Sequence, residues 1–214
     1  MARKLERRQP SRKITQKILI ACEGSKTEPV YFKSIRNELR LPTLEIIILP
    51  HQSKTDPGNI IERLIEERQQ MKNEKRWTTN DTAWAVFDGD EHIEISRNNW
   101  QKAINRANSQ KIKLAITNPC FELWYLIHFQ DHLSQINREK LIQLLNKYIP
   151  EYEKSISLYP KPLQSLTETA IQRAEKIAKQ IEREQLYEYS NPCCSDLPKL
   201  VSSLLGLKDS SSQQ

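Results

Sequence analysis

Two short apolar segments, each followed at once by carboxylates, constrain the fold of this chain most strongly. The first segment is residues 17–22, which Glu23 follows directly. The second is residues 82–87, which Asp88 and Asp90 follow. Continuous apolar runs of this length are typical of strands that are buried on both faces of a parallel sheet. The sequence therefore predicts a parallel sheet whose strands end in acidic side chains.

Strands and helices are predicted to alternate through the first half of the chain. This alternation indicates an α/β fold, with a parallel sheet, right-handed crossovers and flanking helices. In such sheets ligands bind beyond the carboxyl ends of the strands, which is where the acids lie. The strands are expected at residues 17–22, 44–49, 82–87 and 113–117, and the helices at 27–40, 59–76 and 96–108.

Beyond residue 121 the sequence predicts helices and no further strand. These helices are expected at residues 121–129, 138–148, 165–186 and 197–205. The chain is therefore expected to divide into four parts. They are a basic N-terminal arm at 1–16, an α/β core at 17–132, a helical C-terminal extension at 133–208 and a disordered tail at 209–214.

The chain is basic, with a formal net charge of +6. Six Lys and Arg residues and a single Glu lie within the first thirteen residues. Such an arm either binds the phosphate backbone of a nucleic acid or is an ordinary solvated terminus. The net charge alone does not separate these two interpretations.

The composition excludes several classes of protein. A hydrophobic content of 37% is too high for a disordered chain, and the four glycines form neither a Walker-type loop nor a dinucleotide fingerprint. The four cysteines lack C-x-x-C spacing, which favours reduced thiols in the cytoplasm over a zinc module. Neither a signal core nor a membrane-spanning stretch is evident, so we expect a soluble, cytoplasmic protein.

Glu23, Asp88 and Asp90 are the strongest candidate metal ligands. Alternate residues of a strand point to the same side, so Asp88 and Asp90 are able to face one ion. Carboxylates on neighbouring strand ends suit Mg²⁺, with Mn²⁺ as a substitute, because Mg²⁺ takes few protein carboxylates and keeps sites for water and phosphate. Asp-Gly-Asp is also a common turn, so a purely structural role is the alternative.

Three further residues are weaker candidates for the same site. Glu28 either adds a second metal ligand or only complements the positive end of a helix. Lys26 either neutralises a phosphate and the charge that develops on it or is a solvated loop lysine. Glu122 is an acid in the first turn of an apolar helix, just past a strand end, and its place predicts that it reaches the same edge.

The histidines give weaker signals. His92 follows the acids directly and is either a proton carrier near neutral pH or a surface group. His128 and His132 have the spacing of half a zinc site, but the sequence places no convincing further ligand beside them, which favours a structural role.

With these residues in view, the chain resembles the RloB family, whose members carry a Toprim-like (topoisomerase–primase) domain. The resemblance extends through the C-terminal half, at Tyr159-Pro-Lys161 and Asn191-Pro192. The motifs that carry it are Cys22-Glu-Gly with Thr27-Glu-Pro-Val-Tyr-Phe32, Phe87-Asp-Gly-Asp-Glu-His92 and Asn118-Pro-Cys-Phe-Glu-Leu-Trp124.

The resemblance implies a Toprim-like parallel sheet in which Glu23, Asp88 and Asp90 bind Mg²⁺. Related two-metal Toprim nucleases use extra acids, for which Glu28 and Glu122 are the candidates here. Glu28 follows Glu23 by five residues, where the nuclease pattern usually has four. Proteins of this family are encoded beside restriction–modification genes, often next to a partner ATPase, and are associated with antiphage defence.

The leading hypothesis is a Mg²⁺-dependent nuclease that cleaves DNA or RNA, including tRNA, in antiphage defence. One alternative is a nucleotidyl transferase that resembles primases. The other is a non-catalytic, nucleic-acid-binding regulatory subunit of an ATPase-linked defence system. Because the chain has no ATP-binding loop, control by ATP would come from a partner protein.

Overall fold

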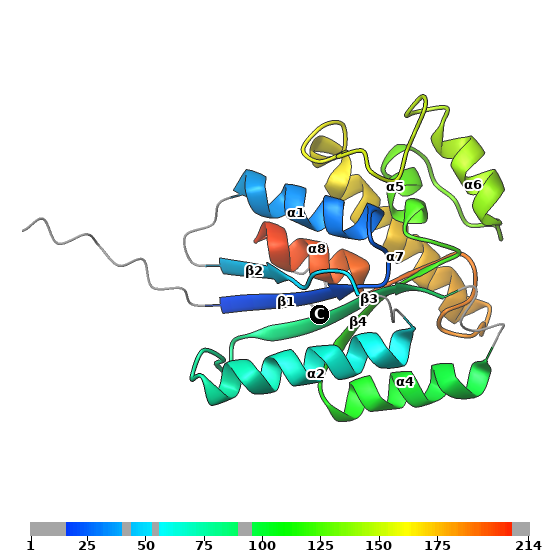
Figure 1. Cartoon of the computed structure of the whole chain (residues 1–214). Helices are drawn as coiled ribbons and strands as arrows, with labels where there is room; N and C mark the ends of the chain where they lie inside the picture. Colours follow the sequence, from blue (N-terminus) through cyan, green and yellow to red (C-terminus); the bar gives the residue numbers. More distant parts are fainter. Residues whose placement is uncertain (1–15, 40–43, 53–55, 90–95, 207–214) are drawn as a thin grey trace, which may run out of the picture.

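The computed structural model describes residues 16–39, 44–52, 56–89 and 96–206 and contains a five-stranded sheet (Figure 1). The strand order is β2-β1-β3-β4-β5. The first four strands are parallel, and β5 pairs antiparallel with β4. The predicted α/β fold is therefore confirmed. The strands are β1 (Gln16–Cys22), β2 (Leu44–Ile48), β3 (Thr82–Asp88), β4 (Lys113–Asn118) and β5 (Cys193–Ser195).

Strand β5 corrects the prediction that no strand follows residue 121. It contains three residues and pairs Cys194 with Thr117 and Cys193 with Asn118. A segment this short has no hydrophobic period of its own, so its neighbours along the chain do not reveal it. The exposed edge of β4, which offers unpaired backbone groups, is what makes it a strand.

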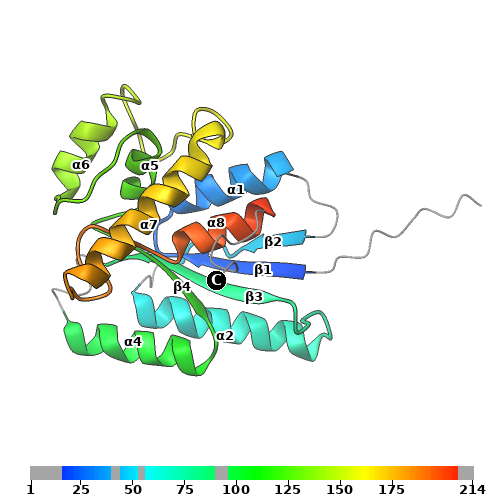
Figure 2. The same ribbon diagram turned by 180° about the vertical axis from the view of Figure 1, so that it is seen from behind.

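Helices cover both faces of the sheet, as Figures 1 and 2 show from opposite sides. On one face lie α2 (Pro57–Asn73) and α4 (Arg97–Ser109). On the other, α1 (Thr27–Leu39) and α8 (Leu197–Leu205) lie next to the strands. The remaining helices also pack on this second face, where α5 contacts β4 and α7 contacts β5. These helices are α5 (Glu122–Phe129), α6 (Arg138–Leu145), the 3₁₀ helix η1 (Gln164–Leu166) and α7 (Thr167–Arg183).

The middle segments of β1 and β3 are apolar because each face of these strands packs on a different helical layer. In β3, Ala85 and Phe87 join the core cluster of α2 and α4, whereas Trp84 and Val86 join the cluster of α1, α5 and α8. Side chains of a strand alternate between the two faces, so the middle of a strand that is covered on both sides is apolar at successive positions.

The C-terminal helices share the second of these cores with the N-terminal half of the chain. Ala170 and Ile177 of α7 and Leu200 of α8 belong to the same buried cluster as Tyr31 and Phe32 of α1. Residues from both halves of the sequence therefore build the core between the sheet and the helices on its second face. In the described ranges, none of the helices has the length and apolar character needed to cross a membrane.

Candidate active site at the carboxyl edge of the sheet

The strand order brings Glu23 and Asp88 together. Strands β1 and β3 are direct neighbours, with Cys22 opposite Val86. The backbone N–H of Glu23 continues this pairing by donating to the carbonyl oxygen of Val86, at 2.9 Å. One carboxylate oxygen of Glu23, Oε2, then accepts a hydrogen bond of 3.0 Å from the backbone N–H of Asp88. Two acids that lie 65 residues apart in sequence thus meet at one edge of the sheet.

The carboxylate of Asp88 is held by two side chains from other elements. Its Oδ1 accepts a hydrogen bond of 2.8 Å from the hydroxyl of Thr117 on β4. Its Oδ2 lies 3.3 Å from Nη2 of Arg138, the first residue of α6. The Asp88 side chain is 16% exposed, so the carboxylate is mostly buried yet still reaches solvent.

Glu28, in the first turn of α1, lies buried beside these two acids. Its carboxylate oxygen Oε1 accepts a hydrogen bond of 3.0 Å from the backbone N–H of Gly24. A Cβ atom at position 24 would collide with both carboxylate oxygens of Glu28, so only glycine lets the two approach. Burial, together with the nearby charges of Glu122 and Glu23, raises the pKa of Glu28 to about 7.

Glu122 is the fourth acid of this region and the first residue of α5. It is buried, and its Oε1 accepts hydrogen bonds from the hydroxyls of Thr27, at 3.2 Å, and Tyr152, at 3.0 Å. The Thr27 hydroxyl, at the start of α1, thus donates to an acid 95 residues away. Glu122 lies close enough to raise the pKa of Glu28, as its position after β4 predicted.

The acids at this edge repel one another. Burial raises the pKa of Asp88 well above its ordinary value, and the charges of Glu28 and Glu23 raise it further. Arg138 and the hydrogen bond from Thr117 oppose this rise. A buried group of carboxylates with one nearby arginine either retains protons or attracts additional positive charge.

The described residues do not by themselves form a metal site. Among them, no group of three or more His, Cys, Asp or Glu side chains is arranged so that it could hold a metal ion. Asp90, the third predicted ligand, and His92, the predicted proton carrier, lie outside the described residues. Glu23 and Asp88 are two carboxylates, which is the number that proteins commonly offer to Mg²⁺.

Lys26 and the two later histidines form no ion pair with the acids in the described residues. Lys26 is exposed in the loop before α1, and no ion pair joins it to another residue of the described ranges. His128 is buried edge-on against the Trp124 ring, and its Nδ1–H donates to the Trp124 carbonyl oxygen at 2.7 Å. Burial lowers the pKa of His128 to about 4. His128 thus packs in the core of the second face, and within the described residues neither His128 nor His132 belongs to a group able to hold a metal.

Three residues of this region were not predicted from the sequence: Thr117, Arg138 and Tyr152. The place of Thr117 follows from the strand register, because Asp88 lies directly opposite it on β4. Arg138 has a local signal, since Asn137 caps α6 by accepting a hydrogen bond from the Lys140 N–H at 2.8 Å. Nothing in the sequence indicates that this helix start returns to the sheet edge.

Comparison with known proteins adds the family. No curated protein and no solved structure matches the chain significantly. A family model described as RloB-like protein matches residues 18–204. This range contains β2, β3, β4 and all but the first two residues of β1, together with Glu23, Glu28, Asp88 and Glu122. Because the match covers most of the chain, the protein belongs to the RloB-like family.

Proposed function

We propose that this protein is a Mg²⁺-dependent nuclease and that the carboxyl edge of its sheet is the active site. The observation that carries the proposal is the gathering of Glu23, Glu28 and Asp88 from three separate elements at this edge. Buried carboxylates that raise one another's pKa are costly to a fold. Such clusters are typical of functional sites, where a cation or substrate offsets the repulsion.

The donor chemistry fits a hard divalent cation. Glu23 and Asp88 would hold it, with Asp90 as the third ligand that the sequence offers. Mn²⁺ prefers the same oxygen ligands and would substitute for Mg²⁺. When bound, the ion would polarise a scissile phosphate and lower the pKa of a bound water.

The side chains around these ligands have roles of their own. The Thr117 hydroxyl orients Asp88, because its hydrogen bond fixes Oδ1. The Arg138 guanidinium lies at Oδ2 and is placed to contact a phosphate oxygen that enters the site. Glu28, with a pKa of about 7, is suited to accept a proton near neutral pH. Lys26, exposed in the loop before α1, would meet the incoming phosphate backbone.

Membership of the RloB-like family supports a role in antiphage defence. We propose cleavage of DNA or RNA, including tRNA, under the control of a partner ATPase. The basic character of the chain agrees with a nucleic-acid substrate, because Lys and Arg supply the phosphate contacts of such proteins.

The proposal is tested by incubating the purified protein with labelled tRNA and plasmid DNA in Mg²⁺, in Mn²⁺ and in EDTA. We expect cleavage with either metal, loss in EDTA, and loss in Glu23→Gln and Asp88→Asn. Glu168→Gln, which changes an exposed acid on α7, is the matched control and should cleave normally. Cleavage at the full rate in EDTA or in Glu23→Gln would overturn the proposal.

Two further arms separate the alternative functions. Incorporation of labelled nucleoside triphosphates on a template, without cleavage, would indicate primase-like nucleotidyl transfer. Binding of nucleic acid by Glu23→Gln and wild type alike, without cleavage in any metal, would indicate a regulatory subunit.

A further inference from the structure

The outer surface of α4 contains no carboxylate. Residues 96–121 include neither Asp nor Glu, although these acids make up 27 of the 214 residues. The exposed side chains of α4 and of the turn after it are cations and amides instead. Among them are Arg97, Lys102, Asn105, Arg106, Asn108 and Lys111.

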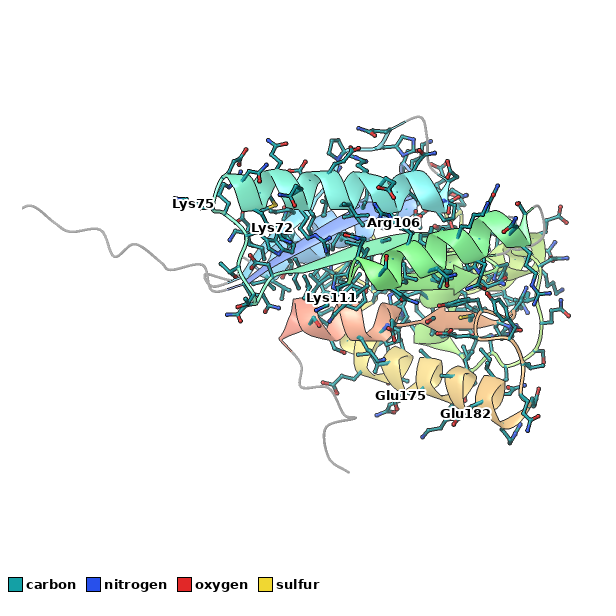
Figure 3. All side chains as sticks on the ribbon, turned by 90° about the horizontal axis from the view of Figure 1, so that it is seen from below. Lys72, Lys75, Arg106, Lys111, Glu175 and Glu182 are labelled. Atoms are coloured by element: carbon teal, nitrogen blue, oxygen red, sulfur yellow. The ribbon has the colours of Figure 1, made fainter. Side chains whose placement is uncertain are left out.

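The end of α2 extends this surface. Helices α2 and α4 lie side by side on one face of the sheet, and Figure 3 shows Lys72 and Lys75 at the end of α2 near Lys111 at the end of α4. Arg106 of α4 forms an ion pair with Glu62 of α2, with 2.6 Å between Nε and Oε1. We call Lys72, Lys75, Lys102, Arg106 and Lys111 together the basic surface.

The lysines of the basic surface have no counter-charge in the described part of the chain. No ion pair joins Lys72, Lys75, Lys102 or Lys111 to an acid there. On the opposite layer, α7 mixes its lysines with exposed acids such as Glu175 and Glu182 (Figure 3). Helix α2 also carries exposed acids, Glu62 and Glu66, so the excess positive charge on this side comes from α4, which has no carboxylate.

Two of these lysines hold positions that favour glycine. Lys75 and Lys111 end α2 and α4 in the left-handed conformation, with φ of 56° and 54°. Because side chains are strained there, the backbone gives no reason for lysine at either place. A lysine at a helix end does complement the helix dipole, and that role would make it a residue for stability. If these lysines instead bind a ligand, their substitution should weaken the affinity for that ligand without lowering the stability of the protein.

We propose that the basic surface binds the phosphate backbone of a nucleic acid. Lys, Arg and Asn side chains are the usual partners of phosphate oxygens, and the lack of carboxylates along α4 removes the repulsion that a polyanion would meet. This proposal rests on the proposed nuclease function, because the nucleic acid that binds the basic surface is taken to be the substrate of the nuclease. Helix α4 has 13 residues and so runs about 20 Å. It leads from the carboxyl edge, where the acids lie, to the opposite edge of the sheet.

The test measures binding without cleavage. Full-length protein in EDTA is titrated into a fluorescently labelled DNA duplex, and separately into a labelled RNA hairpin, at salt concentrations between about 50 and 200 mM. The variant is Lys75→Gly with Lys111→Gly. It removes two positive charges and places at both positions the residue that best adopts the left-handed backbone conformation. We expect an affinity loss of about tenfold at low salt and a salt slope smaller by about two. The melting temperature should not fall.

Two control variants separate this outcome from general effects. Gln185→Gly changes a neutral residue in the same backbone conformation, with φ of 51°, at the end of α7. Lys179→Gln removes an exposed charge from α7. Both should bind as the wild type does. Wild-type affinity and slope in the double glycine variant would overturn the proposal, and so would an equal loss in Lys179→Gln.

The duplex and the hairpin distinguish the two nucleic acids. A loss with one of them alone supports the proposal and names the ligand. Failure of this inference is distinguishable from failure of the proposed function, because no cleavage is measured. If Glu23→Gln abolishes cleavage while the double glycine variant binds normally, the nuclease proposal stands and the basic surface is not a binding site.

Discussion

Arg138 Nη2 lies 3.3 Å from Asp88 Oδ2, so the first residue of α6 supplies the positive charge that faces the acid at the end of β3. Burial and two neighbouring carboxylates, Glu28 and Glu23, raise the pKa of Asp88. Arg138 therefore stabilises the ionised form of Asp88. A phosphate or a divalent cation that enters the site would meet this pair directly.

Replacing Arg138 by Gln should destabilise the protein more in EDTA than in Mg²⁺. Without the guanidinium, the charge of Asp88 is opposed by Glu23 and Glu28, and a bound cation would restore the balance. We expect a loss of about 1–2 kcal/mol in the free energy of unfolding at pH 8 in EDTA. Urea denaturation with and without Mg²⁺ measures it. Arg183→Gln, which breaks an exposed pair with Glu184, is the control. A loss that is equal with and without Mg²⁺ would contradict cation binding at this pair.

Glu28 should make the protein less stable as the pH rises. Its pKa is raised from 4.5 to about 7, so between these values the folded protein holds a proton that the unfolded chain releases. The stabilisation is complete below pH 4.5 and is lost as the pH rises through 7. In EDTA, the wild type should lose up to about 3 kcal/mol relative to Glu28→Gln over this range. Urea denaturation of both proteins at several pH values checks this, and parallel pH curves would contradict it.

Gly24→Ala should impair cleavage more than folding. The added Cβ would collide with the carboxylate of Glu28, which would have to leave its hydrogen bond to the Gly24 N–H. We expect cleavage at least about tenfold slower, because small displacements of reacting groups are costly. Gly58→Ala is the control, since its Cβ would lie 3.3 Å from one oxygen of Asp56. Rate and melting temperature are measured for both variants, and normal cleavage by Gly24→Ala would show that the position of Glu28 is unimportant.

Thr117→Val should shift the pH dependence of cleavage. The buried hydroxyl donates to Asp88 Oδ1 and lowers the pKa of that acid. Valine has nearly the same shape but no donor, so the pKa of Asp88 should rise and the acidic limb of the pH–rate profile should move to higher pH. Stability should fall by about 1 kcal/mol. Thr169→Val, at an exposed position of α7, is the control. An unchanged pH–rate profile in Thr117→Val would show that the ionisation of Asp88 does not control the rate of cleavage.

The periodicity of the sequence was sufficient to predict the helices and the parallel strands. The apolar runs before Glu23 and Asp88 predicted strands buried on two faces, and β1 and β3 have that environment. The carboxyl ends of parallel strands share one edge, so the proximity of Glu23 and Asp88 followed as an expectation.

Only the tertiary structure decided which distant residues complete the site. The order β2-β1-β3 makes β1 the direct neighbour of β3, although β2 lies between them in sequence. Arg138 reaches Asp88, Tyr152 reaches Glu122, and Cys193 pairs with β4 through packing that joins segments dozens of residues apart. Local periodicity reports whether a residue is buried. It does not report which other segment buries it, because that choice depends on the packing of the whole chain.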